Sequence, residues 1–496
     1  MKLYLQKSPI SIDRPFWLLT ELFVHQPCGF LLDSGMDPKK LGRFSFIGGR
    51  PTALLKAKRI PGSNDRAFQI ECLRWRSADG KISPSSASSV QKWRGDPFEA
   101  LRQLQQEYGQ VEEITSEFPF CGGLVGCLGY ETAHAVEDLP DKGRDDQGLP
   151  DLAFMVTDEV LVHDHSSGET HLLVTGRADT AGGAQSDAET RTRELMELIN
   201  HSPAAEKMPL AKPADNNIRT HFSRETYMQA VDRCRQHILA GDVFEVCLTH
   251  RLETDLSLPP WQLYKRLRNI NPAPFASWLH FPDFQVVSAS PERFLKLDES
   301  RQAESRPIKG TRPRGDNPWD DQRLRDELQN SEKDRSENVM IVDLVRNDIG
   351  KVAEIGTVQV PELLLVEPYA TVFQLVSTIT GQLRSKCDGF DLVRACFPGG
   401  SMTGAPKIEA MKIIDRIEPV KRGIYSGAIG YFDRSGTLDL SIVIRTIVCK
   451  DGKATFGVGG AVVADSDPAQ EYQETLDKAR ALIEALGGNF EHRHSG

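Results

Sequence analysis

Short apolar segments separated by turns run along the first 175 residues of the chain. The pattern over 44–48, 67–72 and 159–162 predicts β-strands, and the apolar spacing over 97–108 predicts a helix. We therefore expect this part of the chain to be rich in β-sheet.

A change in composition marks the main boundary. Between residues 178 and 217 the chain is rich in Ala, Gly, Ser, Asp and Pro, interrupted by a predicted helix over 189–199. We expect 1–200 to form an amino-terminal, sheet-rich domain, 201–217 a linker and 218–490 a second domain.

Helices and strands mix in the second domain without a regular βαβ repeat. Helices are predicted over 224–240, after Ser331 and over 468–486, and strands over 243–249, 285–297 and between 427 and 463. This order favours an α+β fold with antiparallel sheets over a doubly wound parallel sheet.

Composition narrows the class of protein. The chain has 496 residues, 39% of them hydrophobic and 26% charged, with 60 Lys+Arg against 70 Asp+Glu and a net charge of −10. These values are typical of a globular protein, and the acidic charge argues against nucleic-acid or anionic-membrane partners. Without a membrane-length apolar run, a targeting segment or a C-x-x-C pair, a cytoplasmic location is expected.

The last predicted helix carries a cluster of charges. Asp467 is a candidate N-cap, with Gln470 positioned to complete a capping box. Glu471, Glu474 and Lys478 then share one helical face. By itself this pattern is typical of a solvated surface.

A second acidic pair, Asp334 and Glu337, has the same spacing before the apolar stretch 339–345. A solvent-exposed helix is again the simple alternative. If the two helices face one another, four carboxylates surround one point and repel unless a hard divalent cation lies between them. Mg²⁺ suits such oxygen ligands.

Lys309 lies among arginines in the segment 306–315, which Gly and Pro interrupt. Such a lysine is usually surface charge. Held on a Gly-Thr turn with partial burial, its pKa would fall toward the range of a nucleophile. Upstream, Glu292 is predicted at a strand-to-turn corner, as an acid or as a turn cap.

Two glycine-rich segments, 397–407 and 456–462, match neither a P-loop nor a dinucleotide fingerprint. Their backbone N–H groups can hold a carboxylate, with Arg445 as a bidentate partner. Tight turns without a ligand are the alternative.

Taken together, several motifs resemble those of the chorismate-binding enzymes, in order from about 220 to 486. They are 307–311, 333–337, 343–348, 404–407, 423–430 and 471–475. The resemblance implies antiparallel sheets packed as a sandwich with flanking helices, the amino-terminal part being interlocked with the catalytic domain.

The resemblance also assigns site residues. Glu337 and Glu474 match Mg²⁺-coordinating positions, supported by Asp334 and Glu471. The positions that match chorismate contacts are Gly310, Thr311, Tyr425, Arg445, Gly459, Gly460, Ala461 and Lys478. Ala461 stands where glycine is usual in this family.

Lys309 selects the expected reaction within the family. The aminodeoxychorismate-forming branch has lysine there, so we expect covalent attack by Lys309 at C2 and protonation of the leaving hydroxyl by Glu292, followed by ammonia addition at C4. Gln374 replaces a histidine common in anthranilate-forming members, and Glu245 replaces the lysine of water-adding members.

Two alternatives stay open. One is an anthranilate-forming subunit, and the other is a non-catalytic tryptophan-binding homologue, because Ser34, Pro274 and Phe275 lie in segments that resemble the effector pocket of this branch. Whether tryptophan binds does not follow from the sequence.

The source of ammonia is expected outside this chain. Cys127 lies in a segment faintly similar to the nucleophile turn of glutamine amidotransferases, but Tyr130 and Glu131 follow and no suitable His-x-Glu appears. We interpret Cys127 as a core residue. The resemblance therefore implies a separate glutamine amidotransferase subunit.

Overall fold

A computed structural model gives the fold of the chain. It describes residues 1–10, 16–34, 41–60, 62, 66–75, 86–109, 117–201, 211–369 and 372–489.

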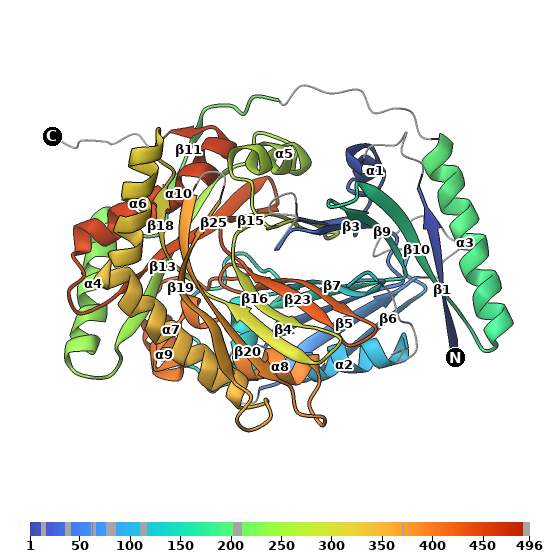
Figure 1. Ribbon diagram of the computed structural model, residues 1–496, viewed down its shortest axis with the longest axis horizontal. Coiled ribbons are helices and arrows are strands. Elements are labelled where there is room, and N and C mark those ends of the chain that lie inside the picture. Colours follow the sequence, from blue (N-terminus) through green and yellow to red (C-terminus); the bar gives the residue numbers. More distant parts are fainter. Residues whose placement is uncertain are drawn as a thin grey trace.

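Two large antiparallel sheets face one another (Figure 1). The first sheet has the order β1 (Lys2–Pro9), β10 (Glu169–Ala178), β9 (Glu159–Asp164), β3 (Phe44–Gly48), β2 (Phe30–Asp33), β14 (Phe275–His280), β15 (Gln285–Ser290), β24 (Thr446–Lys450), β25 (Lys453–Val462), β13 (Glu245–Asp255) and β12 (Arg219–Thr220), with β21 (Gly404–Ala405) beside β13.

The second sheet has the order β18 (Ile308–Pro313), β20 (Val372–Gln382), β17 (Gln302–Arg306), β16 (Arg293–Leu297), β23 (Leu438–Ile442), β22 (Ala428–Asp433), β7 (Gly123–Leu128), β8 (Leu152–Thr157), β4 (Ala53–Arg59), β5 (Phe68–Arg74) and β6 (Ser89–Gly95), with β19 (Gln359–Pro368) beside β20. A separate parallel pair joins β11 (Asn216–Asn217) to β26 (Gly488–Asn489).

Helices cover the outer faces and ends of the sheets (Figure 1). They are α1 (Phe16–Phe23), α2 (Pro97–Glu107), α3 (Ala181–His201), α4 (Arg224–Leu239), α5 (Pro260–Ile270), α6 (Pro318–Asn330), α7 (Glu332–Gly350), α8 (Gly389–Cys396), α9 (Lys407–Ile417) and α10 (Pro468–Leu486), with short 3₁₀ turns at Tyr130–Ala135 and Gly400–Met402.

Each sheet is continuous across the two parts of the chain. In the first sheet β2 pairs with β14, and in the second β7 pairs with β22. The antiparallel α+β sandwich predicted from the sequence is confirmed. Each sheet takes strands from before and after the predicted boundary, and most of the predicted linker lies outside the described residues.

The segment predicted as one strand over 285–297 forms two strands in different sheets. β15 belongs to the first sheet and β16 to the second, because the chain turns at Pro291 and Glu292. The structure therefore places Glu292 where the chain crosses between the sheets. In contrast, helix α10 has the predicted bounds.

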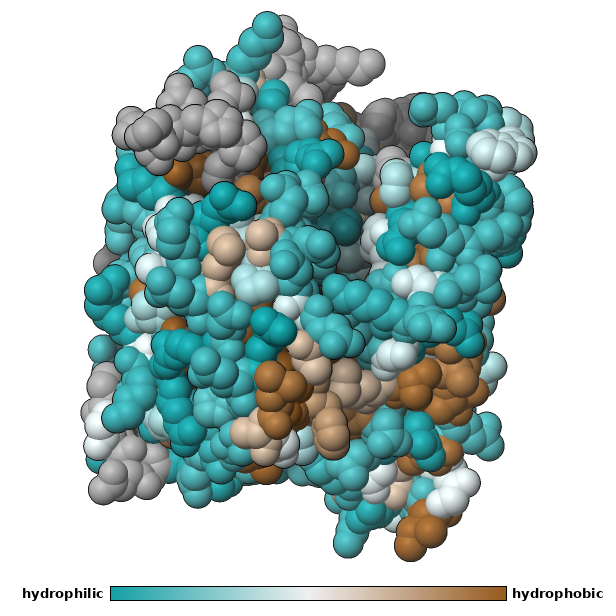
Figure 2. All heavy atoms as spheres, turned by 90° about the vertical axis from the view of Figure 1, so that its left-hand side faces the viewer, coloured by the Kyte–Doolittle hydropathy of each residue, from teal (hydrophilic) through white to brown (hydrophobic). Residues whose placement is uncertain are grey.

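Apolar side chains from both sheets pack together in one core, such as Val162 of β9 and Val286 of β15 with Ile429 of β22. Cys127 is 1% exposed within β7, as expected of a core residue. Among the described residues, no helix is long and apolar enough to span a membrane. The face formed by the left-hand helices of Figure 1 is mostly hydrophilic, with apolar patches in its lower half (Figure 2).

Candidate active site

Helices α7 and α10 bring their acidic faces together beside the first sheet. Asp467 caps α10 by accepting from the Gln470 N–H at 2.9 Å, and Ser331 caps α7 by accepting from the Asp334 N–H at 3.3 Å. Both helices therefore begin at defined residues, one turn before the carboxylates of the site. Their arrangement fixes where Glu337 and Glu474 can meet.

Three carboxylates surround the ammonium of Lys333. Its Nζ lies 3.9 Å from Glu337 Oε1, 3.6 Å from Glu471 Oε1 and 3.9 Å from Glu474 Oε2. Burial alone would lower the pKa of Lys333, but these carboxylates raise it. Glu337 of one predicted acidic pair thus meets both members of the other pair, with a cation of the chain itself among them.

Asp334 does not join this cluster. Its carboxylate accepts from Arg312 Nη2 at 3.1 Å, so the expectation of four carboxylates around one point is wrong for this residue. Asp334 instead packs against Gly310, where an added Cβ would lie 2.8 Å from Asp334 Cγ. Its place in the site is to support the backbone beside Lys309.

The acidic cluster has the donor chemistry for a divalent cation. Glu337 Oε1 and Glu471 Oε2 are buried and accept no hydrogen bond from any described residue. Burial raises the pKa of Glu337, although Lys309 opposes it, to about 7, and burial also raises the pKa of Glu471. Within the described residues, no three His, Cys, Asp or Glu side chains stand close enough to hold a metal as they are. Because Lys333 is 52% exposed at the side chain, it can withdraw and leave the carboxylates to a cation.

Lys309 lies in strand β18 at a β-bulge and not on a turn. The pairing with β20 shifts register between Ile308 and Thr311, and Gly310 has φ +84°. A glycine suits this position because its left-handed backbone conformation strains other residues. The bulge directs Lys309 Nζ to within 3.0 Å of Glu245 Oε1 and 3.9 Å of Glu337 Oε2.

The prediction that Lys309 has a lowered pKa is wrong. Burial does lower it, but the charges of Glu245 and Glu337 outweigh burial and raise the pKa of Lys309 above its ordinary value. The sequence prediction rested on partial burial and neighbouring cations and missed the acidic partners, which come from β13 and α7. The resting side chain is an ammonium.

Glu292 is enclosed at the crossing between β15 and β16. Its Oε1 accepts from Ser401 Oγ at 2.8 Å, and its residue is 5% exposed. Burial raises the pKa of Glu292 to about 7, although the Ser401 hydrogen bond and the Lys309 charge oppose it. A carboxyl group with this pKa can hold a proton and donate it near neutral pH.

The segment Gly459–Gly460–Ala461 is part of strand β25 and not the predicted turn. Gly460 pairs with Leu248 and Ala461 with Cys247 of β13. A Cβ on Gly460 would lie 2.8 Å from Glu471 Oε2. Glycine therefore lets the acidic face of α10 lie close to the sheet, while the Ala461 methyl is accommodated.

Arg445 carries a buried charge without an acidic partner among the described residues. It has φ +50°, its Nη1 lies 3.4 Å from Asn271 Oδ1, and burial lowers its pKa. An unpaired buried guanidinium suits an anionic ligand such as a carboxylate. The ligand role of Arg445 stays a prediction.

Two further predicted contact residues line the same region. Lys478 Nζ bonds Glu474 Oε1 at 2.7 Å and the Gly459 carbonyl at 2.9 Å. The Tyr425 ring packs so closely on β25 that a Cβ at Gly457 would lie 2.3 Å from it. Thr311 is exposed and pairs with Gln374 of β20.

Sequence reasoning missed Lys333 and Ser401. Lys333 precedes Glu337 by four residues, a helical spacing that signals contact, but its position among three acids depends on how α10 packs. Ser401 lies in the glycine-rich segment 397–407, and no local spacing links it to Glu292.

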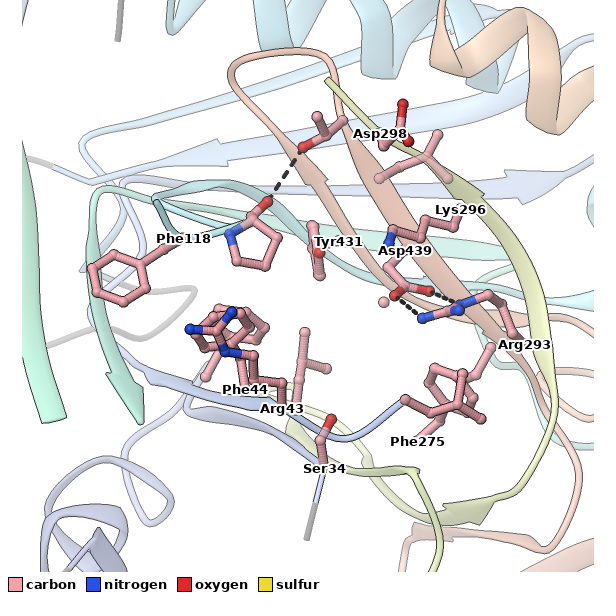
Figure 3. A pocket seen from close by; sticks show the side chains of 18 of the residues that line it. Ser34, Arg43, Phe44, Phe118, Phe275, Arg293, Lys296, Asp298, Tyr431 and Asp439 are labelled. Atoms are coloured by element: carbon pink, nitrogen blue, oxygen red, sulfur yellow. Dashed lines mark hydrogen bonds and ion pairs between the residues drawn. The ribbon is translucent and has the colours of Figure 1, made fainter. Parts of the chain in front are cut away.

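The predicted effector pocket coincides with a separate cavity of about 630 Å³ between the sheets (Figure 3). Ser34 and Phe275 line it, whereas Pro274 is buried beside Phe275 and is not among the lining residues. Arg293 and Asp439 also line the cavity and form an ion pair at 2.8 Å. The cavity combines aromatic side chains with both signs of charge.

A model of the chorismate binding enzyme family matches residues 67–484. The chain therefore belongs to this family.

Individual relatives are similar over most of this chain. An aminodeoxychorismate synthase of Streptomyces griseus is 42% identical over 97% of the chain, and the chain spans 62% of that protein. Aminodeoxychorismate synthase component 1 of Bacillus subtilis is 37% identical, with 91% of each protein covered. Anthranilate synthase component 1 of Cereibacter sphaeroides is 36% identical, covering 96% of the chain and 92% of that protein.

Solved structures share the fold. Anthranilate synthase component I of Streptococcus pneumoniae superimposes with a TM-score of 0.75 at 29% identity, covering 88% of this chain and 91% of that one. The isochorismate synthase MenF of Escherichia coli has a TM-score of 0.70 at 15% identity, covering 98% and 95%.

Proposed function

We propose that the protein aminates chorismate at C4, forming 4-amino-4-deoxychorismate for 4-aminobenzoate and folate synthesis. The observation that carries the proposal is that an enclosed lysine, Lys309, lies near enough to the buried acid Glu292 for its charge to act on the pKa of that carboxyl group. The relatives named aminodeoxychorismate synthase support it. Ammonia would come from a separate glutamine amidotransferase subunit.

The neighbouring residues favour this reaction over its alternatives. Gln374, which is buried on β20, cannot act as the base that pyruvate elimination to anthranilate needs. Glu245 is an acid where water-adding relatives have a lysine. The site therefore retains a nucleophile and an acid without either alternative base.

In the proposed reaction the amine of Lys309 attacks C2 of chorismate. The diene shifts, the C4 hydroxyl leaves, and Glu292 supplies the proton that makes it water. Ammonia then adds at C4 and the C2–nitrogen bond to Lys309 breaks. The net change exchanges a hydroxyl group for an amino group.

Lys309 must first lose a proton, because its resting form is the ammonium. The nearest acceptor is Glu245 Oε1 at 3.0 Å, whose partner oxygen Oε2 accepts no hydrogen bond from any described residue. Because Lys309 and Glu245 are already in contact, the proton passes between them inside the site when the dianionic substrate enters.

The charged groups divide the recognition of the substrate. Arg445 would bind one carboxylate of chorismate. Glu337, Glu471 and Glu474 would hold Mg²⁺, which when bound neutralises the carboxylates and orients the second substrate carboxylate. Lys478 keeps Glu474 in place through their 2.7 Å ion pair.

Product identification tests the proposal. The purified chain is incubated with chorismate, Mg²⁺ and ammonium chloride, and an aminodeoxychorismate lyase is then added. Lyase-dependent 4-aminobenzoate is expected, with ammonium but not with glutamine alone. Lyase-independent anthranilate would overturn the proposal. The absence of both products would also overturn it and would favour a ligand-binding homologue.

A further inference from the structure

A buried ion pair outside the reacting groups ties three elements around the candidate acid. Lys407, the first residue of α9, pairs with Asp348 of α7. Both are buried, Lys407 being 9% and Asp348 2% exposed. Neither residue is used by the proposed reaction, although their motifs stood out in the sequence.

The ammonium group of Lys407 donates to three buried acceptors. Besides Asp348, its Nζ donates to the Cys396 carbonyl at 2.7 Å and to the Pro398 carbonyl at 2.8 Å. An ammonium has three hydrogens, so all are engaged. The Cys396 carbonyl ends helix α8, where a cation is favoured, and the Pro398 carbonyl lies in the following loop.

The loop after Pro398 ends on Glu292. Ser401 in this loop donates to Glu292 Oε1 at 2.8 Å. The loop packs closely on α7, since a Cβ at Gly400 would lie 2.7 Å from Leu344 Cδ2. Lys407 therefore fixes the first part of the short segment Cys396 to Ser401, and the last side chain of that segment orients the acid.

Desolvating a lysine and an aspartate costs several kcal/mol, so a buried ion pair contributes little net stability. Two apolar side chains would fill the same space without this desolvation cost. Lys407 donates to two specific carbonyls upstream of Ser401, that of Cys396 at the end of α8 and that of Pro398 in the loop, and apolar side chains cannot make these contacts.

We propose that Lys407 and Asp348 are positioning residues, which act through Ser401 to hold the carboxyl group of Glu292 in place. The inference rests on the proposed role of Glu292. The charged groups that act on Glu292 are Lys309 from β18 and Lys478 from α10, and Lys407 adds a constraint on geometry.

Infrared titration of Glu292 tests the inference without requiring turnover. The protonated carboxyl stretch is isolated by subtracting the spectrum of Glu292→Gln in each background. Because the Ser401 hydrogen bond lowers the pKa of Glu292, Ser401→Ala should raise that pKa by roughly half a unit to one unit. Lys407→Met should raise it in the same direction and by a similar amount.

The double variant Ser401→Ala/Lys407→Met distinguishes positioning from general damage. It should shift the pKa of Glu292 no further than Ser401→Ala does. The matched control is Lys58→Met, which removes a partly buried lysine bonded to Asp151 at 3.1 Å and should lower stability without moving the pKa of Glu292.

If Lys407→Met does not fold, Asp348→Asn gives the second test, with a smaller upward shift expected. An unchanged pKa of Glu292 in the folded Lys407 or Asp348 variant, or additive shifts in the double variant, would overturn the inference. Failure of the wild type to aminate chorismate would instead contradict the proposed function. The pKa of Glu292 could still be measured in that case, because the titration does not depend on turnover.

Discussion

Lys309 and Glu245 form an enclosed ion pair, with Nζ 3.0 Å from Oε1 and side chains 10% and 0% exposed. The candidate nucleophile is therefore stored as an ammonium and depends on the proton acceptor beside it. Position 245 and position 309 act as a unit, although 64 residues separate them in the chain.

Glu245→Gln should destabilise the protein because it removes the nearer ion-pair partner of the enclosed Lys309 and leaves the more distant Glu337, at 3.9 Å. Breaking a buried pair costs about 3–5 kcal/mol. The pKa of Lys309 is raised in the folded state. The ion pair therefore contributes fully to the free energy of unfolding below the ordinary lysine pKa of about 10.4, and this contribution is lost as pH rises through the raised pKa.

Chemical denaturation at pH 6 to 9 measures this effect, and the loss should be constant over that window. Asp477→Asn is the control, since its pair with Arg480 is exposed and should contribute less than about 1 kcal/mol. A loss in Glu245→Gln no larger than in the control would contradict the account.

Glu337→Gln should stabilise the protein at pH 8 in the absence of divalent cations. The pKa of Glu337 is raised to about 7, so the folded state binds its proton more tightly than the unfolded state does. Stability therefore falls as pH rises from about 4.5 through 7. The variant lacks this loss and should melt a few degrees higher.

Added Mg²⁺ should reverse the order of these two proteins. A ligand that binds the native state raises the melting temperature, so the wild type should gain and Glu337→Gln should not. Glu409→Gln, on a surface pair with Lys412, serves as the control. Equal gains in all three proteins would argue against a metal at this cluster.

Arg445→Met should separate stability from substrate binding. The variant removes a buried cation that has no acidic partner among the described residues, so the substrate-free protein should be as stable as the wild type or more so. Chorismate binding should weaken by about 10- to 100-fold, since a charge-assisted contact is worth roughly 1.5–3 kcal/mol.

Calorimetry with chorismate and thermal melts together check this prediction. Arg416→Met, at the last turn of α9, is the control and should bind chorismate normally. Unchanged affinity in Arg445→Met would mean that Arg445 does not contact the substrate.

Sequence patterns predicted the local elements and the helical faces of the site. The N-cap Asp467 and the spacing of Glu471 and Glu474 are encoded within a few residues, so α10 was predictable to its ends. The meeting of Glu337 with α10 was one of two interpretations of the charge pattern, since a solvent-exposed face has the same spacing, and the resemblance to the family favoured it.

Contacts that depend on the crossing between the sheets were not predictable. The sequence predicts Glu292 at a strand-to-turn corner, but the local pattern does not show that the chain crosses there from one sheet to the other. Likewise, the Glu245 carboxylate reaches Lys309 only because a bulge turns β18 toward β13. The resulting pKa of Lys309 has the opposite direction to that expected from its neighbours in sequence.

The product formed by Lys309→Ala tests the central claim most directly. The variant and the wild type are incubated with chorismate, Mg²⁺ and ammonium and analysed chromatographically with and without added lyase, with Lys412→Ala as the control. The account predicts that C4 amination falls by at least about 10²-fold in Lys309→Ala, with any remaining product shifted toward anthranilate, and stays normal in the control. An unchanged rate and product in Lys309→Ala would contradict it.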